Sequence, residues 1–154
     1  MQGTQWMRRI LLTGGLLLTA TIAQAEPIER YIDPAMAEAN LPFSQAVRVG
    51  DMLYLSGQIG NIPGTLDLAP GGMEAQARQT MDNIKTVLEA NGATFAEVTK
   101  CLVMLSDMSQ WADFNKVYVT YFEPGQFPAR SAFGASGLAL GGALEIECEA
   151  YLGD

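Results

Sequence analysis

Apolar residues at helical spacing predict two helices in this chain. The first extends from Glu74 to Asn91, and the glycine that follows is a favourable helix end. Its apolar face consists of Ala77, Met81, Ile84, Val87 and Leu88. The second begins at Asp107 or Ser109, either of which can cap a helix, and ends near Phe122. Its apolar positions are Trp111, Phe114, Val117, Tyr118, Tyr121 and Phe122. We interpret this aromatic stripe as a packing face rather than a ligand site.

Shorter apolar runs predict strands around these helices. The predicted strands comprise residues 45–49, 52–56, 98–105, 130–134 and 143–151. A tight turn at Gly50-Asp51 joins the first two. The run 98–105 is apolar almost throughout, which predicts a strand buried on both faces, whereas residues 26–42 are predicted as an extended lead-in. The order β-β-α-β-α-β-β predicts one α+β domain, in which two helices cover one face of a mixed sheet.

The last predicted strand places acidic and apolar side chains on opposite faces. The acidic face carries Glu145, Glu147 and Glu149, and the other face carries Leu144, Ile146, Cys148 and Ala150. We expect the apolar face to meet the helices. The acidic face is then a solvated outer surface, or it lines a water-filled cleft or a subunit interface.

The first 25 residues have the pattern of a secretory signal peptide. Arg8 and Arg9 precede an apolar run from Ile10 to Ala20, and Ala23-Gln24-Ala25 is a small-x-small cleavage site. A transmembrane anchor is the alternative, but the run is shorter than the roughly 20 residues that a bilayer requires. We therefore expect a single domain at 26–154, located in the periplasm or secreted, with no membrane attachment after cleavage.

The composition excludes several classes of function. The net charge of the 154-residue chain is −8, and the predicted cleavage removes two of its cations, so the chain is a poor partner for nucleic acid or anionic membranes. The chain has no histidine, which excludes Ser-His-Asp and Cys-His catalysis and HExxH metal sites. We expect neither a metal nor a cofactor. Any chemistry must use arginine, carboxylates, hydroxyls, backbone groups and water.

Cys101 and Cys148 are the two cysteines of the chain. Both lie in predicted strands among apolar neighbours, so we interpret them as two buried thiols that pack as small apolar residues. A single disulfide is the alternative, because an exported protein enters a compartment where disulfides form. Their redox state is not decided by the sequence.

Arg130 and Glu145 are the candidate catalytic residues. Arg130 lies in the segment Phe127–Ser131 at the start of a predicted strand, and a guanidinium group offers a planar fork of donors to a carboxylate. Glu145 begins the acidic face of the last strand, where a carboxylate could orient a water molecule. In an alternative interpretation, Arg130 is only a structural ion-pair partner of Glu145 or Glu147 at a subunit interface.

Four segments of the chain resemble those of the reactive intermediate deaminase family, also called RidA or YjgF. They are the SGQI segment at 56–59, the QARQ helix with its DN pair at 76–85, the PARS segment at 128–131 and the LEIE strand at 144–147. The resemblance covers residues 41–151. It implies a chorismate-mutase-like α+β fold and a homotrimer whose sheets form a barrel-like core, with active clefts between subunits.

The resemblance also implies an activity, which is the hydrolysis of reactive enamines and imines to 2-keto acids and ammonia without a cofactor. Arg130 matches the arginine that holds the substrate carboxylate, Glu145 the acid that positions water, and Ser56 and Gly57 line the pocket. Two further pocket positions depart from the family: Phe43 replaces a typical tyrosine, and Ala132 replaces a frequent cysteine. These departures leave open a non-catalytic protein that binds small carboxylates. A ribonuclease, also reported in the family, is opposed by the negative charge and the absence of histidine.

Overall fold

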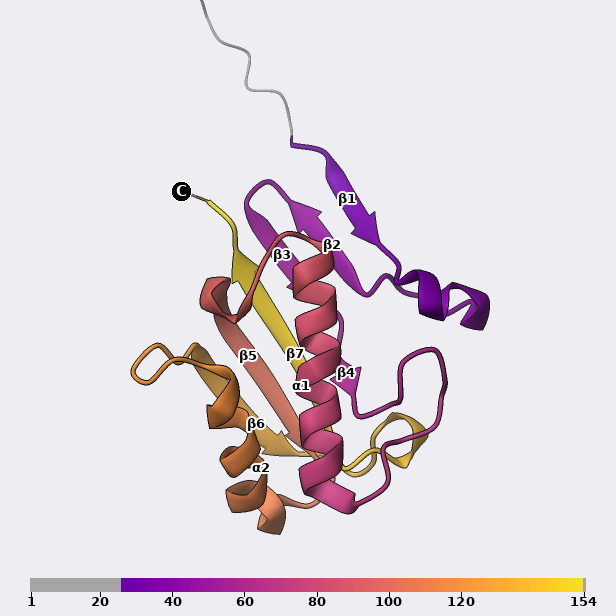
Figure 1. Cartoon of the computed structure of the whole chain (residues 1–154), viewed down its shortest axis with the longest axis vertical. Coiled ribbons are helices and arrows are strands. Elements are labelled where there is room, and N and C mark those ends of the chain that lie inside the picture. Colours follow the sequence, from indigo (N-terminus) through magenta and orange to yellow (C-terminus); the bar gives the residue numbers. More distant parts are fainter. Residues whose placement is uncertain (1–25, 154) are drawn as a thin grey trace, which may run out of the picture.

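Seven strands form one mixed sheet in the computed structural model, which describes residues 26–153. The strands are β1 (Ile28–Tyr31), β2 (Ala46–Val49), β3 (Met52–Leu55), β4 (Gln58–Ile59), β5 (Val98–Leu105), β6 (Ala129–Gly134) and β7 (Leu144–Tyr151). Their spatial order is β1-β2-β3-β7-β5-β6, and β4 pairs with β7 beyond the end of β3 (Figure 1). Only the β5–β6 pair is parallel among the described strands. The central strand β7 therefore carries Glu145 in the middle of the sheet.

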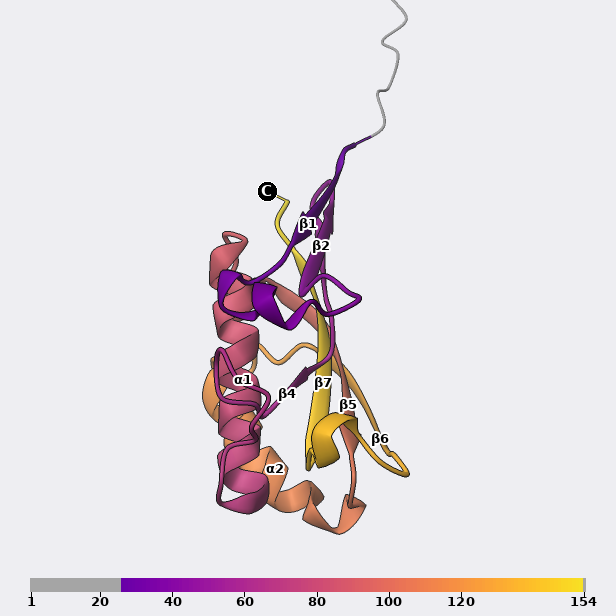
Figure 2. The same cartoon turned by 90° about the vertical axis from the view of Figure 1, so that its right-hand side faces the viewer.

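Two α-helices cover one face of this sheet, as predicted. They are α1 (Gly72–Ala90) and α2 (Trp111–Tyr118), and Figure 2 shows both on the same side of the strands. Short 3-10 turns lie at Pro34–Ala39, Phe95–Glu97, Met108–Gln110, Val119–Tyr121 and Ala139–Gly141. The second helix is shorter than predicted because its two ends are 3-10 turns. At the first of these, the carboxylate of Asp107 accepts a hydrogen bond from the backbone N–H of Ser109.

The hydrophobic core lies between the helices and the sheet. The apolar residues of α1 at helical spacing, Ala77, Met81, Ile84 and Leu88, are fully buried. They face the apolar residues of β7, Leu144, Ile146, Cys148 and Ala150, which are also buried. Burying a large apolar side chain contributes about 1.5–3 kcal/mol. The alternation predicted for the last strand is therefore confirmed, and Glu145 lies on the face that points away from the helices.

The opposite face of the sheet has no helix over it among the described residues (Figure 2). It carries large apolar side chains that are exposed in the single chain: Ile28, Val49, Tyr54, Phe133 and Tyr151. The three glutamates of β7 lie among them. An apolar surface of this extent is typical of a protein interface. We refer to this surface as the open face of the sheet.

Two strand predictions need correction. Residues 28–31, predicted as part of an extended lead-in, form β1, which pairs with β2 in an antiparallel register that the sequence pattern did not signal. Strand β5 was predicted to be buried on both faces, but only its helix-facing side is buried. On the open face, Leu102 and Met104 are half-buried and Lys100 is exposed. No part of residues 26–153 covers that side of β5 in a single chain.

The two cysteines form a disulfide bond, so the interpretation as two free thiols is wrong. Cys101 and Cys148 are direct neighbours in the β5–β7 register, with Cα atoms 4.1 Å apart, and their sulfurs are bonded. Both side chains point into the core beneath the helices. The sequence could not reveal this pairing, because the two residues are 47 positions apart and only the register brings them together.

The predicted signal peptide, residues 1–25, lies outside the described residues. Among residues 26–153, no helix is long and apolar enough to cross a membrane.

Candidate active site

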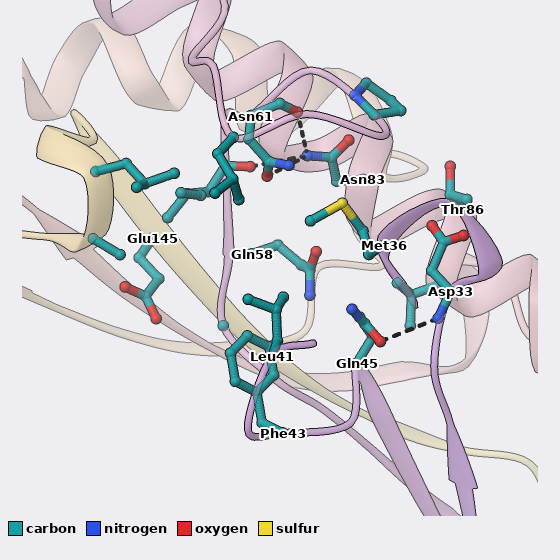
Figure 3. Close-up of a pocket in the computed structure, with 17 residues that line it drawn as sticks. Asp33, Met36, Leu41, Phe43, Gln45, Gln58, Asn61, Asn83, Thr86 and Glu145 are labelled. Atoms are coloured by element: carbon teal, nitrogen blue, oxygen red, sulfur yellow. Dashed lines mark hydrogen bonds between the residues drawn. The ribbon is translucent and has the colours of Figure 1, made fainter. Parts of the chain in front are cut away.

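Glu145 lies at one side of a cavity of about 380 Å³. Phe43, Gly57 and Gln58 also line this cavity, which opens between the segment before β2, the loop after β4 and helix α1 (Figure 3). The carboxylate of Glu145 packs directly on Gly57, where it fills the space that a Cβ atom would occupy. Gly57 is thus required for close approach and not for an unusual backbone angle.

Burial changes the acidity of Glu145. Partial desolvation raises the pKa of its carboxyl above the ordinary value of 4.5, and the charge of the neighbouring Glu147 raises it further. A carboxyl with a raised pKa both accepts and returns a proton more readily near neutral pH. Glu145 therefore suits a reaction in which water loses a proton and a leaving amine gains one.

Helix α1 holds the backbone on both sides of Glu145. The Asn83 side-chain amide donates to the backbone oxygens of Ile59 and Asn61, at 3.0 and 2.9 Å. The Gln76 side-chain oxygen accepts a hydrogen bond of 2.8 Å from the backbone N–H of Ala143, just before β7. Gln76 and Asn83 both belong to the helix segment 76–85 that resembles the family motif. Their side chains fix β4 and the start of β7 relative to α1.

Ser56 lies beside this cavity and not among the residues that line it. Its hydroxyl donates to the backbone oxygen of Ser44 at 2.7 Å, and its backbone N–H donates to the oxygen of Gln45 at 2.9 Å. These two bonds fasten the segment that carries Phe43. In the single chain, Ser56 therefore positions the cavity wall.

Arg130 lies in a different part of the molecule, on the edge strand β6. Its register partner is Cys101, so its side chain points to the helix-facing side of the sheet. The guanidinium carbon lies 4.6 Å from the ring centroid of Trp111 and 4.4 Å from that of Tyr118, both on α2. These are cation–π distances. Ala132, two residues later on the same face, is partly buried.

One nitrogen of Arg130 lacks a hydrogen-bond partner within residues 26–153. Its Nη1 atom is buried and has no hydrogen-bond partner among the described residues. A buried donor without a partner costs about 1–3 kcal/mol, more when it is charged. The aromatic rings hold the guanidinium, and the Tyr118 hydroxyl, which is also buried without a partner in the described part of the chain, forms no hydrogen bond with it. A planar carboxylate would satisfy the free donor and the charge together.

Arg130 and Glu145 do not meet within one chain. Arg130 shares a face with Cys101 and Cys148, and Glu145, three residues before Cys148, points to the other face. The ion pairs in residues 26–153 join other residues, including Lys100 with Glu149. The alternative interpretation, an ion pair of Arg130 with Glu145 or Glu147 at a subunit interface, stays a prediction, because one chain alone does not bring these residues together.

Three aromatic residues surround Arg130 and were not predicted as part of a site. Trp111, Phe114 and Tyr118 were interpreted as a packing face, and they do pack, but their rings also form the surroundings of the guanidinium. Burial raises the pKa of Tyr118 to about 12, while the charge of Arg130 opposes this shift, so the phenol stays protonated at neutral pH. The available signal was the spacing of three, four and seven along α2, which places all three rings on one side.

No group of three or more His, Cys, Asp or Glu side chains within the described part of the chain has the arrangement of a metal site. The cavity beside Glu145 and the aromatic surroundings of Arg130 are the two half-sites of the candidate active site. Their chemistry rests on one guanidinium group, one carboxyl group and the apolar walls around them.

The chain belongs to the Endoribonuclease L-PSP family, whose model matches residues 34–152. A goat (Capra hircus) protein named 2-iminobutanoate/2-iminopropanoate deaminase is 41% identical over 127 residues, 82% of this chain and 92% of the goat protein. The human protein of the same name is 39% identical over the same length and coverage. The crystal structure of RidA from an Antarctic Psychrobacter bacterium matches with a TM-score of 0.69 and 37% identity, covering 84% of this chain and 99% of that one. The predicted family and fold are confirmed.

Proposed function

We propose that this chain hydrolyses reactive 2-imino and 2-enamino acids to 2-keto acids and ammonia. The observation that carries the proposal is the buried, unpartnered Nη1 of Arg130 on its aromatic support, because a substrate carboxylate is the group that fits it. The names of relatives about 40% identical to the chain support the same reaction. In this proposal Arg130 anchors the carboxylate and Glu145 positions the attacking water.

The reaction requires only substrate positioning and one acid–base group from the protein. The imine carbon is already electrophilic, so water adds to it and forms a new C–O bond. The tetrahedral carbon then expels ammonia as the C–N bond breaks and the C=O bond forms. Glu145 accepts a proton from the water and returns a proton to the leaving nitrogen, which its raised pKa favours. Holding the carboxylate fixes the imine carbon near this acid, which supplies proximity.

The substrate lies between subunits in this proposal. Arg130 and Glu145 point to opposite faces of the sheet in one chain, so a single chain cannot place both on one small molecule. The open face exposes Tyr54, Phe133 and Tyr151, which favours its burial against other copies. A homotrimer would satisfy both requirements if Arg130 of one copy approached Glu145 of the next.

A second candidate is a protein that binds small carboxylates without turnover. Phe43 favours it, because phenylalanine keeps the cavity wall but provides no hydroxyl for substrate or water. A ribonuclease is disfavoured by the net charge of −8 and the absence of histidine, even though the family model carries that description. We therefore retain the binding protein as the alternative.

We also propose that the domain works outside the cytoplasm. The disulfide between Cys101 and Cys148 supports this location, because such bonds persist in oxidising compartments. The signal-peptide pattern of residues 1–25 supports it independently. Cell fractionation with an antibody to the mature domain would test the proposal, and recovery of the mature protein only from the cytoplasm would overturn it.

The first experiment tests imine hydrolysis through Arg130. An amino-acid oxidase generates 2-imino acids, semicarbazide traps them, and purified 26–154 is added to compete with the trap. We expect wild type to suppress the trapped product and Arg130→Ala to lose this ability by at least about 100-fold, since the anchor that fixes the substrate is removed.

The matched control is Arg78→Ala, because the Arg78 side chain forms an exposed ion pair with Glu74 away from Arg130 and Glu145, and its loss should not affect activity. Failure of a folded, oligomeric wild-type protein to suppress the trapped product would favour the binding protein instead.

The pH dependence of kcat/KM should report the raised pKa of Glu145. Activity requires the ionised base, so it should fall as the pH decreases through a pKa that lies above 4.5. In Glu147→Gln this acid limb should move to lower pH, because the second cause of the raised pKa is removed while burial remains. Glu149→Gln, whose carboxylate pairs with Lys100, serves as the control and should leave the limb in place. An acid limb unaffected by Glu147→Gln would assign the titration to another group.

A further inference from the structure

The cavity beside Glu145 extends well beyond the reacting carboxyl group. It is bounded by the segment 33–45, the loop after β4, helix α1 and the turn Ala139–Gly141 (Figure 3). Its volume of about 380 Å³ lies within the range of small-molecule sites, about 300–1,000 Å³. A two- or three-carbon imino acid has only a few heavy atoms and would leave most of this space unused.

The walls of the cavity are mainly apolar. Apolar side chains that line it include Met36, Leu41, Phe43, Leu66, Val87 and Leu140. Phe43, Leu66 and Leu140 are about half exposed in the chain, which is unusual for three large apolar residues around one opening. Leu140 also has a φ of 56°, in the left-handed region that favours glycine. Strained backbone of this kind occurs more often at ligand sites.

The polar groups in the walls have other partners. The amides of Asn61 and Asn83 bond to each other and to backbone oxygens, so they hold the loop after β4 in place. The Gln45 side-chain oxygen accepts from the backbone N–H of Asp33 at 3.1 Å. The described lining includes two carboxylates, Asp33 and Glu145, and no cation. A second negative charge on a substrate would therefore be repelled there.

We propose that the preferred substrates are 2-imino acids with long apolar side chains: branched aliphatic, thioether or aromatic. The side chain occupies the cavity while the imine carbon lies next to Glu145, and the carboxylate extends out of the cavity toward an arginine. This inference rests on the proposed imine hydrolysis and adds the substrate class to it. Imines of acidic amino acids are excluded by Asp33 and by the absence of a cation in the described lining.

A comparison of imines tests this specificity. Amino-acid oxidases generate the imines of alanine, leucine, methionine, phenylalanine and glutamate, and competition with semicarbazide gives a kcat/KM for each. We expect the leucine, methionine and phenylalanine imines to exceed the alanine imine by at least about tenfold, since each methylene bound in an apolar pocket contributes about tenfold or more. Equal values, or a preference for the alanine imine, would overturn the inference and leave the proposed function intact. Absence of turnover with every imine would instead overturn the proposed function, and this inference with it.

Two variants locate the preference in this cavity. Thr86→Phe narrows it from an exposed position of α1, and Leu66→Asp places a charge on its loop wall, where the exposed position favours correct folding. Each should lower the leucine-to-alanine ratio of kcat/KM about tenfold. Ala90→Phe, exposed at the end of the same helix and outside the cavity, should leave the ratio unchanged. An unchanged ratio in both cavity variants would place the preference elsewhere and contradict the inference.

Discussion

Two inactive variants of this chain, Arg130→Ala and Glu145→Gln, are expected to recover activity when they are combined in one oligomer. Each variant alone should lose at least about 100-fold in kcat/KM. Arg130→Ala removes substrate positioning and Glu145→Gln removes general acid–base catalysis, and each effect contributes at least about 100-fold to the rate. Arg130 and Glu145 point to opposite faces of the sheet in one chain. An interface that pairs Arg130 of one subunit with Glu145 of the next would contain some intact sites in a mixed oligomer.

The amount of recovered activity shows whether the two residues of one site come from neighbouring subunits. In a ring with head-to-tail interfaces, random mixing of equal amounts leaves roughly one site in four with both residues intact. The experiment is to co-express the two variants, purify the mixed oligomer with two tags, and measure imine hydrolysis against wild type. As a reference, Arg130→Ala is mixed with wild type at the same ratio, which shows how activity falls when half of the subunits lack Arg130. A mixed oligomer as inactive as its parents would show that both residues serve the same subunit's site, or that one of them has no part in it.

Reduction of the Cys101–Cys148 disulfide is expected to lower the free energy of unfolding by about 2–4 kcal/mol. In the chain-entropy model, a crosslink between residues 47 positions apart lowers the conformational entropy of the unfolded chain. This stabilises the folded protein by about 4 kcal/mol. The crosslink joins β5 to β7, the strand that carries Glu145, so its loss also weakens the centre of the sheet. Urea unfolding with and without reductant, at one protein concentration, would measure the change, because subunit association adds to apparent stability.

The slope of the unfolding curve gives a second test of the disulfide. A reduced unfolded chain is more expanded, so the dependence of the free energy on urea should become steeper on reduction. Cys101→Ala/Cys148→Ala is the control: its unfolding should resemble that of the reduced protein and should not respond to reductant. Identical midpoints for wild type with and without reductant would contradict the prediction.

Local patterns in the sequence were sufficient for most of the fold. The helix at 74–91 and the strand at 98–105 are found close to their predicted bounds, because apolar periodicity directly reports which side of an element meets the core. The two faces of β7 followed from alternation alone. Strand β1 was missed, because each face of this four-residue edge strand carries one charged residue and one apolar or aromatic residue, so the sequence shows no alternation.

The sequence also named residues of both half-sites, but not their arrangement. Motif resemblance identified Arg130 and Glu145, while nothing local indicated that Trp111 and Tyr118 would enclose the guanidinium of Arg130. The cavity beside Glu145 was likewise unpredictable, since its walls come from four separate segments. Such features depend on contacts between residues far apart in the chain.

The sequence by itself determined both helices, five of the strands, the acidic face of the last strand and the family, because these follow from residue types at short spacing. Only the tertiary structure decided that Cys101 and Cys148 are bonded, since strand register sets which residues face each other. Only the tertiary structure decided that Arg130 and Glu145 lie on opposite faces of one sheet. The physical reason is the same in both cases: a strand alternates its side chains predictably, but its neighbours and their register are chosen by the packing of the whole chain.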